Sequence, residues 1–546
     1  MSLVAYGAQD VYLTGNPQIT FWKVTYRRYT NFAMESIEQT FNGQADFGRR
    51  VTCTISRNGD LAYRTYLQVT LPEINQQMSN SNCCVDGNCD DNSGSGETHG
   101  VYARWLDFPG EQLISQVEVE IGGQRIDRQY GDWMHIWNQL TLSAEQQRGY
   151  YSMIGNTTQL TYITDPAFNS VDGPCSSDAP RQVCAPRNAL PETTLYIPFQ
   201  FWYCRNPGLA LPLIALQYHE VKINLDIRPI DECLWAVTSL GDCSQHCSST
   251  KVVTAYNQSL VAASLYVDYV FLDTDERRRM AQNPHEYLIE QLQFTGDESV
   301  GSSSNKIKLN FNHPCKELVW VVQPDENVDY CSSLECGEIL FKTLGAQPFN
   351  YTDAIDALPN SVLAYGSLAQ TADTITDGLF TDQHVFDVSA SGQTVATQDD
   401  RGALSANAQG SGAGNGVSDA GVFVLAETAL NMHCWGENPV VTAKLQLNGQ
   451  DRFSEREGTY FDLVQPYQHH TRNPDTGINV YSFALRPEEH QPSGTCNFSR
   501  IDNATLQLVV SAAAIGGTQT AKVRVYATNY NVLRVMSGMG GLAYSN

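Results

Sequence analysis

One order of strand-like segments occurs twice along this chain of 546 residues. Residues 221–228, VKINLDIR, alternate between apolar and polar side chains, which is the period of a strand with one buried face. A slip of one residue would turn every apolar side chain of this strand into water, so its register is well specified. Residues 498–508, FSRIDNATLQL, can be laid on residues 215–225, ALQYHEVKINL, with the apolar residues in register. The chain therefore holds a second, divergent copy of this segment.

A turn and a short helix are predicted just before the first copy. Asn206-Pro207-Gly208 is typical of a turn. Pro212 suits the first turn of a helix, where its missing N–H is no loss, and residues 213–216 would give that helix a buried side.

Other strand-like segments of the first half recur in the same order in the second half, and similar turn or loop residues follow the two members of a pair. The pairs are residues 36–41 with 287–294, 51–71 with 307–322, 117–123 with 443–449, 196–203 with 478–485, and 265–270 with 522–527. A repeat of half the chain is too long for a solenoid. Short strands between turns and long polar loops favour a sandwich of antiparallel sheets. We therefore predict an all-β chain of two tandem eight-stranded antiparallel jelly rolls, with long loop inserts and a few short helices, one of them over residues 133–142.

The repeat also predicts where the chain divides. We expect an N-terminal arm over residues 1–30, a first jelly-roll domain over 31–282, a second over 283–535 with a large loop insert at 325–439, and a C-terminal tail over 536–546. The first domain carries polar, glycine- and serine-rich inserts of its own, which are typical of surface loops.

Charge and hydropathy exclude several classes of partner. The net charge of −25 opposes direct binding to nucleic acid or to anionic membranes. The basic clusters at 21–28, 49–50 and 277–279 are too short for a nucleic-acid stripe, and we interpret them as contacts between domains or subunits. No apolar run is long enough to span a bilayer, and the first residues lack the pattern of a signal peptide, so we expect a soluble cytosolic product.

The cysteines predict neither a disulfide scaffold nor a zinc site. Of the 15 cysteines, Cys53, Cys204, Cys315 and Cys496 lie in or beside strand-like segments, where a small buried hydrophobic residue is expected. The others lie mostly in loops, where the sequence does not decide between free thiols and disulfides. The paired C-x2-C motifs of a zinc ribbon are absent.

Long motifs spread from end to end resemble the major capsid proteins of nucleocytoplasmic large DNA viruses, the double jelly-roll type. They include YRRYTNFA at 26–33, IGGQRIDRQY at 121–130, VDYVFLDTDERRR at 267–279, the segment 464–503, and YNVLRVMSGMGGLAYSN at 530–546. The resemblance implies a structural, late protein of the virion and not an enzyme. It implies a homotrimer with a pseudo-sixfold outline that tiles an icosahedral shell over an internal membrane.

The resemblance also implies partners and an orientation. Neighbouring capsomers and minor capsid proteins beneath the shell would be partners, assembly would take place in the host cytoplasm, and the membrane would be met only indirectly. The loops would crown the trimer outside, and the arm would lie on the inner side, where Lys23, Arg27 and Arg28 would make contacts. No cofactor is expected, and no direct contact with nucleic acid.

Several residues are candidate sites. Asn156, Asn257 and Asn350 lie in N-x-S/T sequons in or near loops, and are acceptors if the chain meets glycosylating enzymes. A charge-paired hinge between the domains is our hypothesis for one further group: Asp273, Asp275, Glu276, Arg277, Arg278 and Arg279.

Two other functions stay open at this point. Outer loops such as 325–439 could engage host glycans, as in a glycan-binding jelly roll. An enzymatic cupin would use a metal, and His469, His470 and the run 488–490 are the candidate ligands, but the spacing of a cupin motif is absent and we expect these side chains to fix loops. No nucleophile motif such as G-x-S-x-G is present, so no catalytic residue is assigned.

Overall fold

The computed structural model describes residues 4–81, 101–161, 164, 189–237, 251–328, 346–353, 436–517 and 519–545. Most of the insert at 325–439 and most of the loop cysteines lie outside these residues. None of the helices in the described ranges is long and apolar enough to cross a membrane.

The first half of the chain forms two four-stranded antiparallel sheets. Their orders are β1-β10-β3-β7 and β2-β8-β5-β6, which together make an eight-stranded jelly roll. The strands are β1 Phe32–Gln39, β2 Arg50–Thr54, β3 Leu61–Leu71, β5 Ile114–Ile121, β6 Gln124–Tyr130, β7 Thr193–Pro198, β8 Val221–Ile227 and β10 Ala262–Leu272. A separate ribbon pairs β4 Tyr102–Trp105 with β9 Leu234–Val237.

The second half repeats this strand order. One sheet runs β11-β20-β14-β17 and the other β13-β19-β15-β16. The strands are β11 His285–Phe294, β13 Ser304–Leu309, β14 Pro314–Pro324, β15 Val440–Leu447, β16 Gln450–Glu457, β17 Asn479–Ser482, β19 Ala504–Val510 and β20 Ala521–Met536. Three short strands extend the first of these sheets: β12 Glu298–Val300, β18 Cys496–Asn497 and β21 Met539–Leu542. The predicted fold class of two tandem jelly rolls is confirmed.

The helices of the described residues are short and lie mostly in connections. In the first half they are η1 Ala8–Asp10, α1 Val11–Thr14, η2 Gln76–Ser81, α2 Pro109–Leu113, α3 Gly131–Thr141, α4 Ala144–Ile154, α5 Thr158–Thr161, α6 Trp202–Arg205, η3 Pro207–Leu209, η4 Ile230–Glu232, α7 Val253–Tyr256 and α8 Thr274–Gln282. In the second half they are η6 Asp325–Val328, η10 Tyr460–Val464, α13 Gln465–His469, η11 Phe498–Arg500 and α14 Ala512–Ile515.

The two copies of the alternating segment occupy the same place in their sheets. β8 pairs with β2 and β5, and β19 pairs with β13 and β15. All four apolar residues of β8 are buried: Val221, Ile223, Leu225 and Ile227. The predicted strand and its register are confirmed.

The helix predicted over 212–216 is reduced to one hydrogen-bonded turn, in which the Ala215 and Leu216 N–H groups both donate to the Pro212 carbonyl, at 3.1 and 3.2 Å. A separate 3-10 turn, η3, lies just before it in the chain. There the Asn206 side chain accepts a hydrogen bond from the Gly208 N–H at 2.9 Å, which caps the turn. The strand-like segment 196–203 also differs from its prediction: β7 ends at Pro198, and α6 begins at Trp202.

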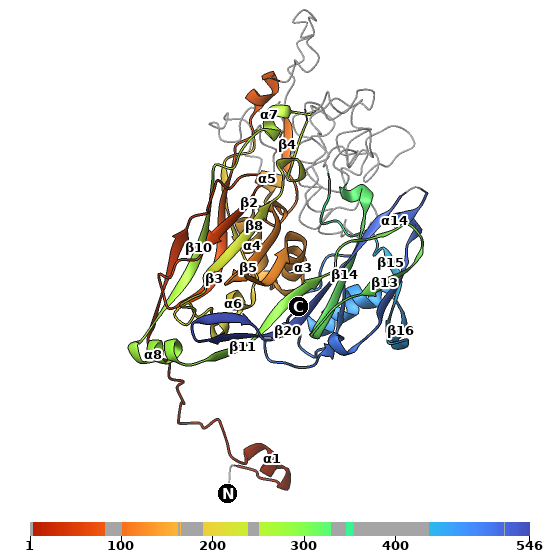
Figure 1. Cartoon of the computed structure of the whole chain (residues 1–546). Helices are drawn as coiled ribbons and strands as arrows, with labels where there is room; N and C mark the ends of the chain where they lie inside the picture. Colours follow the sequence, from red (N-terminus) through yellow and green to blue (C-terminus); the bar gives the residue numbers. More distant parts are fainter. Residues whose placement is uncertain are drawn as a thin grey trace, which may run out of the picture.

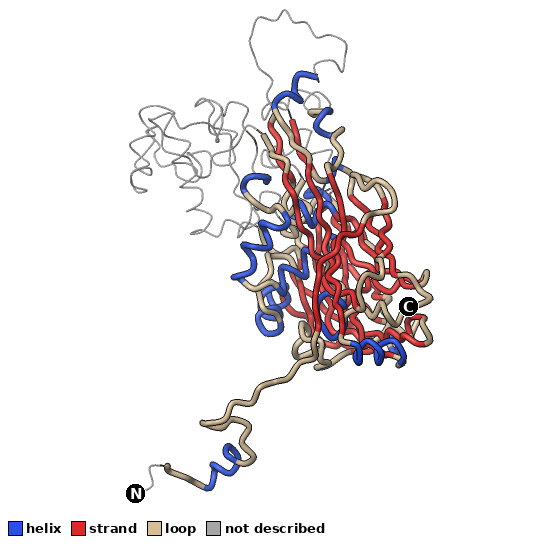
Figure 2. The backbone as a smooth tube through the Cα atoms, turned by 90° about the vertical axis from the view of Figure 1, so that its left-hand side faces the viewer, coloured by secondary structure: helices blue, strands red, loops and turns tan. Residues whose placement is uncertain are grey.

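The two jelly rolls stand side by side, with α3 and α4 between them (Figure 1). Each has an apolar core, the first of which also takes in Ile289, Leu533 and Val535 of β11 and β20, and a third cluster of buried apolar residues joins the two jelly rolls. The N-terminal arm leaves the base of the first jelly roll near α8 and extends away from the body (Figures 1 and 2).

Candidate assembly site: the contact between the jelly rolls and the surfaces left open

An aromatic contact joins α3 of the first jelly roll to the outer face of the sheet that holds β20. The Trp133 ring lies 5.5 Å from the ring of Tyr526, and the ring of Tyr130, at the end of β6, lies 5.1 Å from that of Phe294 on β11. Both members of the first pair are buried. Aromatic side chains bury large areas, so this cluster holds the two jelly rolls together as a core would.

A half-buried ion cluster lies in the same contact. The Asp132 carboxylate is 3.2 Å from the Arg524 guanidinium of β20 and 3.5 Å from that of Arg228. Arg524 also pairs with Asp297 at 2.9 Å. Burial alone would lower the pKa of Arg524, but the facing carboxylates, Asp132 first, outweigh it and raise that pKa. Asp132 therefore neutralises cations from both halves of the chain.

Glu290 on β11 forms a second charged link. Its carboxylate is 2.8 Å from the Lys316 ammonium and 3.2 Å from the Arg205 guanidinium of α6, in the first jelly roll. Burial would raise the pKa of Glu290, but Arg205, His490 and Lys316 together lower it to about 2. The carboxylate is therefore ionised wherever the protein is folded near neutral pH.

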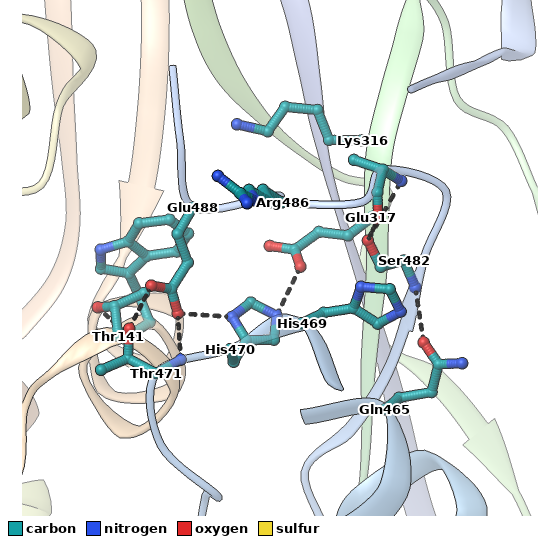
Figure 3. Close-up of polar contacts among 12 residues, drawn as sticks. Thr141, Lys316, Glu317, Gln465, His469, His470, Thr471, Ser482, Arg486 and Glu488 are labelled. Carbon is teal, nitrogen blue, oxygen red and sulfur yellow. Dashed lines mark hydrogen bonds and ion pairs between the residues drawn. The ribbon is translucent and has the colours of Figure 1, made fainter. Parts of the chain in front are cut away.

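His470 lies between two carboxylates, as Figure 3 shows. Its Nε2 is 2.8 Å from Glu317 Oε2, and its Nδ1 is 2.9 Å from Glu488 Oε1. Burial would lower the pKa of His470, but Glu317 and Glu488 raise it to about 9. Both ring nitrogens carry a proton in this state and donate to carboxylate oxygens, so neither has a lone pair for a metal.

The loop after His470 reaches the first jelly roll. The Thr471 N–H and hydroxyl both donate to Glu488, and the Arg472 N–H donates to the Leu140 carbonyl at the end of α3 at 3.2 Å. The charged group of His470, Glu317 and Glu488 therefore fixes a loop that contacts α3. Within the described residues, no group of three His, Cys, Asp or Glu side chains is arranged to hold a metal. The expected loop-fixing role of His470 and Glu488 agrees with this geometry.

The residues of the predicted charged hinge begin and line α8. Within residues 251–328, the one ion pair of this helix joins Arg277 Nε to Asp60 Oδ1 at 3.0 Å. Asp60 belongs to the turn before β3, and its other oxygen accepts from the Leu272 N–H at 2.9 Å. The ion-pair partner of Arg277 is thus an aspartate distant in sequence and not Asp273, Asp275 or Glu276. The hinge role itself stays a prediction.

Two of the three candidate glycan acceptors are buried. The Asn156 side chain accepts from the Phe108 N–H at 3.2 Å, and the Asn350 side chain bonds Gln347 and Thr352. Both asparagines are at most 5 % exposed. A glycan on either amide nitrogen would need space that this packing does not offer, so the burial argues against both acceptors, and the two sites stay predictions. Asn257 is exposed at the end of α7 and stays a prediction.

Lys23, Arg27 and Arg28 lie on the exposed N-terminal arm. The arm also exposes large apolar side chains, among them Phe21, Trp22 and Tyr26. Such a run is unusual for a free surface and is typical of a segment that binds another molecule. The structure brings none of these three cations together with the charged groups between the jelly rolls.

The cysteines in strands agree with their predicted packing role. Cys53, Cys204 and Cys315 are buried free thiols, and Cys496 is half-buried. Burial raises the pKa of the Cys53 thiol to about 11 and that of Cys204 to about 12, which keeps both protonated and unreactive.

Sequence reasoning missed the residues that join the jelly rolls. Residues 133–142 were predicted as a helix, but Trp133 and Trp137 lie four positions apart on it, and this pair of large apolar residues could have marked a buried stripe. Asp132, Arg205, Glu290 and Arg524 have no local pattern that would have identified them.

Two family models together match almost the whole chain. Residues 20–273 match the model described as major capsid protein N-terminus, and residues 276–541 match that of the large eukaryotic DNA virus major capsid protein. The major capsid protein of Chrysochromulina ericina virus is 75% identical, over 100% of this chain and 99% of its own length. That of Paramecium bursaria Chlorella virus 1 is 38% identical, over 100% of this chain and 98% of its own length.

Solved structures agree with these matches. A chain of the quasi-atomic model of the PBCV-1 virus capsid superposes with a TM-score of 0.59 at 32% identity, over 96% of this chain and 100% of that one. The Faustovirus major capsid protein superposes with a TM-score of 0.60 over 97% of this chain and 94% of its own, and at 12% identity it supports the fold alone.

Proposed function

The chain belongs to the major capsid proteins of large eukaryotic DNA viruses, and we propose that it works as a homotrimer that tiles an icosahedral shell. Its family gives it a structural role in the virion and not an enzymatic one. The trimer and its tiling are the proposal that the following observations support.

One observation carries this proposal: a single chain holds two jelly rolls with the same strand order, side by side. Three copies in a ring would present six similar lobes, and a body with six similar lobes can pack hexagonally with its neighbours. Trimers of this one chain could then fill every hexagonal position of the shell, with no second protein needed to complete the sixfold outline.

The proposal includes the parts of the chain and their partners. The arm, the two domains and the tail would divide as predicted at residues 30, 282 and 535, which is supported by family models that meet between residues 273 and 276. Neighbouring capsomers would contact the outer edges of the trimer. Minor capsid proteins, above an internal membrane, would meet the apolar and basic arm. Assembly would take place in the host cytoplasm, and the outer loops would be the place for any contact with host glycans.

Electron microscopy of the purified protein in negative stain tests the proposal. Class averages viewed along the particle axis should show a closed particle with a hexagonal outline. Averages that show single two-lobed particles at micromolar concentration would contradict it. A glycan array with the same sample tests the separate proposal of glycan binding by the outer loops.

A further inference from the structure

We propose that residues 533–542, which we call the strap, complete the first jelly roll from the other half of the chain. The strap consists of the end of β20 and of β21, which turns back on it. The first jelly roll would close, and the chain would become able to form trimers, only after the strap has been made and has docked. The link to trimer formation rests on the proposed function.

The apolar side chains of the strap lie in the core of the first jelly roll. Leu533 and Val535 belong to that core and are at most 1% exposed. Leu542, which pairs with Leu533 in the hairpin, packs against the same core. In Figure 1 the dark-blue end of β20 extends under the first jelly roll, below α6 in this view. The second half of the chain therefore supplies part of the apolar core of the first.

A glycine lets the strap approach this core closely. A Cβ added to Gly540 would lie 2.6 Å from Leu216 Cδ2 and 3.2 Å from Ile121 Cγ2. Both of these side chains are fully buried in the first jelly roll. A residue with a side chain would push the strap away from its site, so glycine is needed at this position.

Backbone hydrogen bonds fix the strap to the loop before β8. The Tyr218 N–H donates to the Gly538 carbonyl at 2.9 Å, and the Gly540 N–H donates to His219 Nδ1 at 3.1 Å. On the other edge, the Leu542 N–H donates to Gln124 Oε1 at 3.4 Å. The strap therefore connects the start of β8 with the start of β6.

The loop that receives the strap is itself held in place by the first jelly roll. Arg57 Nη2 donates to the Leu216 carbonyl at 2.5 Å and to the His219 carbonyl at 3.0 Å. Arg57 lies between β2 and β3, so the receiving loop is shaped by residues of the first half alone. The first jelly roll thus presents a preformed site for the strap.

The strap is an addition to the second copy of the duplicated fold. β10 holds the place in the first jelly roll that β20 holds in the second, and it has 11 residues. The helix α8 follows it, and no strand turns back on it before β11. β20 has 16 residues and returns as β21. Since a jelly roll of this strand order forms without such a hairpin, the contacts of the strap with the first jelly roll account for it best.

The position of the strap in the sequence sets the order of folding. Domains generally fold as units in the order in which they are synthesised. Here the strap follows all other strands of both jelly rolls, so the first jelly roll lacks part of its core until the second has been made. An incomplete chain would keep this core open and would not assemble.

Two buried cysteines report separately on the two cores. Cys53 lies in the core of the first jelly roll and Cys315 in that of the second, and both are 0% exposed. A buried thiol reacts with a maleimide only when its surroundings open. Peptide masses identify which cysteine has reacted, so one labelling experiment compares both jelly rolls of the same molecule.

Gly540→Val tests the strap by this labelling. Cys53 should react faster by about tenfold or more, while Cys315 keeps its rate, because only the first core loses the strap. Gly301→Val is the control, since the nearest atom to an added Cβ there is Thr520 Cγ2, at 3.7 Å. An unchanged rate at Cys53, or equal increases at Cys53 and Cys315, would overturn the inference.

Arrested nascent chains test the order of folding without any substitution. The full chain is followed by a short linker, which keeps the strap inside the ribosome, or by a long linker, which frees it. Cys53 should be protected from maleimide with the long linker only. Protection with both linkers would show that the first jelly roll closes without the strap, and would overturn the inference.

A chain that ends at Met536 tests the link to assembly, because it lacks β21. Light scattering should show that its trimer fraction is lower than that of the full chain by about tenfold or more. If the shortened chain forms trimers as the full chain does, the link to assembly is refuted and the proposed function stands. If the full chain is itself a monomer, the proposed function fails, whereas the labelling of Cys53 still decides whether the strap completes the first jelly roll.

Discussion

Asp132 and Arg524 are 392 positions apart in sequence, yet their side chains meet at 3.2 Å between the two jelly rolls. Asp132 lies in the first turn of α3, the helix that covers the second jelly roll, and Arg524 lies on β20, the strand that this helix covers. The pair therefore ties the covering helix to its sheet, and with Arg228 it balances charge in a place that water reaches little.

Removing the Asp132 charge should loosen the contact between the jelly rolls. Asp132→Asn leaves Arg228 and Arg524 without their shared anion, which should cost roughly 1–3 kcal/mol of the free energy of unfolding. Chemical denaturation measures this cost. Asp451→Asn breaks the exposed pair with Lys444 and should change nothing measurable, so equal losses in both variants would contradict the role of Asp132.

The stability of the second jelly roll should fall at alkaline pH through His470. Its pKa is raised from 6.5 in the unfolded chain to about 9 in the folded chain. The stabilisation is fully present below about pH 6.5 and is lost as the pH rises through about 9, and a shift of this size corresponds to roughly 3 kcal/mol. Unfolding curves between pH 6 and pH 10 measure it.

His470→Gln should flatten that part of the pH profile. His469→Gln is the control, because His469 is partly exposed and its Nδ1 contacts only the Leu485 carbonyl, at 3.2 Å. If the stability of the His470→Gln variant still falls between pH 6.5 and pH 10 as in the unsubstituted protein, another group causes the loss.

Glu290 should make the contact sensitive to acid. Its pKa is lowered from 4.5 to about 2, so its stabilisation is present above pH 4.5 and is lost as the pH falls toward 2. Glu290→Gln should destabilise the chain by about 3 kcal/mol at pH 7 and by much less near pH 2. Glu286→Gln, which removes an exposed partner of Arg534, is the matched control. A loss that does not depend on pH would contradict this account.

The contribution of each arginine to the predicted hinge at α8 can be tested separately. Arg277→Ala removes the pair with Asp60, and since Arg277 is mostly exposed the cost should be about 0.2–1 kcal/mol. Arg278→Ala should have no such effect on unfolding. If the triple change of Arg277, Arg278 and Arg279 to Ala leaves trimer yield and shell assembly as they were, the hinge role is refuted.

The duplicated fold could be predicted because strand periodicity is local. In residues 221–227 and 504–510, apolar side chains alternate with polar ones and so mark the buried face of a strand. The two segments form β8 and β19, which occupy equivalent places in their jelly rolls. The short helix at 212–216 was only partly right: Pro212 begins a single hydrogen-bonded turn that does not continue as a helix.

The contact between the jelly rolls could not be predicted in the same way. Nothing near Asp132 or Arg524 in sequence tells which distant charge each will meet. The burial of Asn156 and Asn350 could not be predicted either, since a sequon says nothing about how its asparagine packs.

Size-exclusion chromatography with light scattering tests the central claim most directly. The account predicts a single species of three times the chain mass of 60.5 kDa, stable on dilution through the micromolar range. A monomer at these concentrations would contradict it.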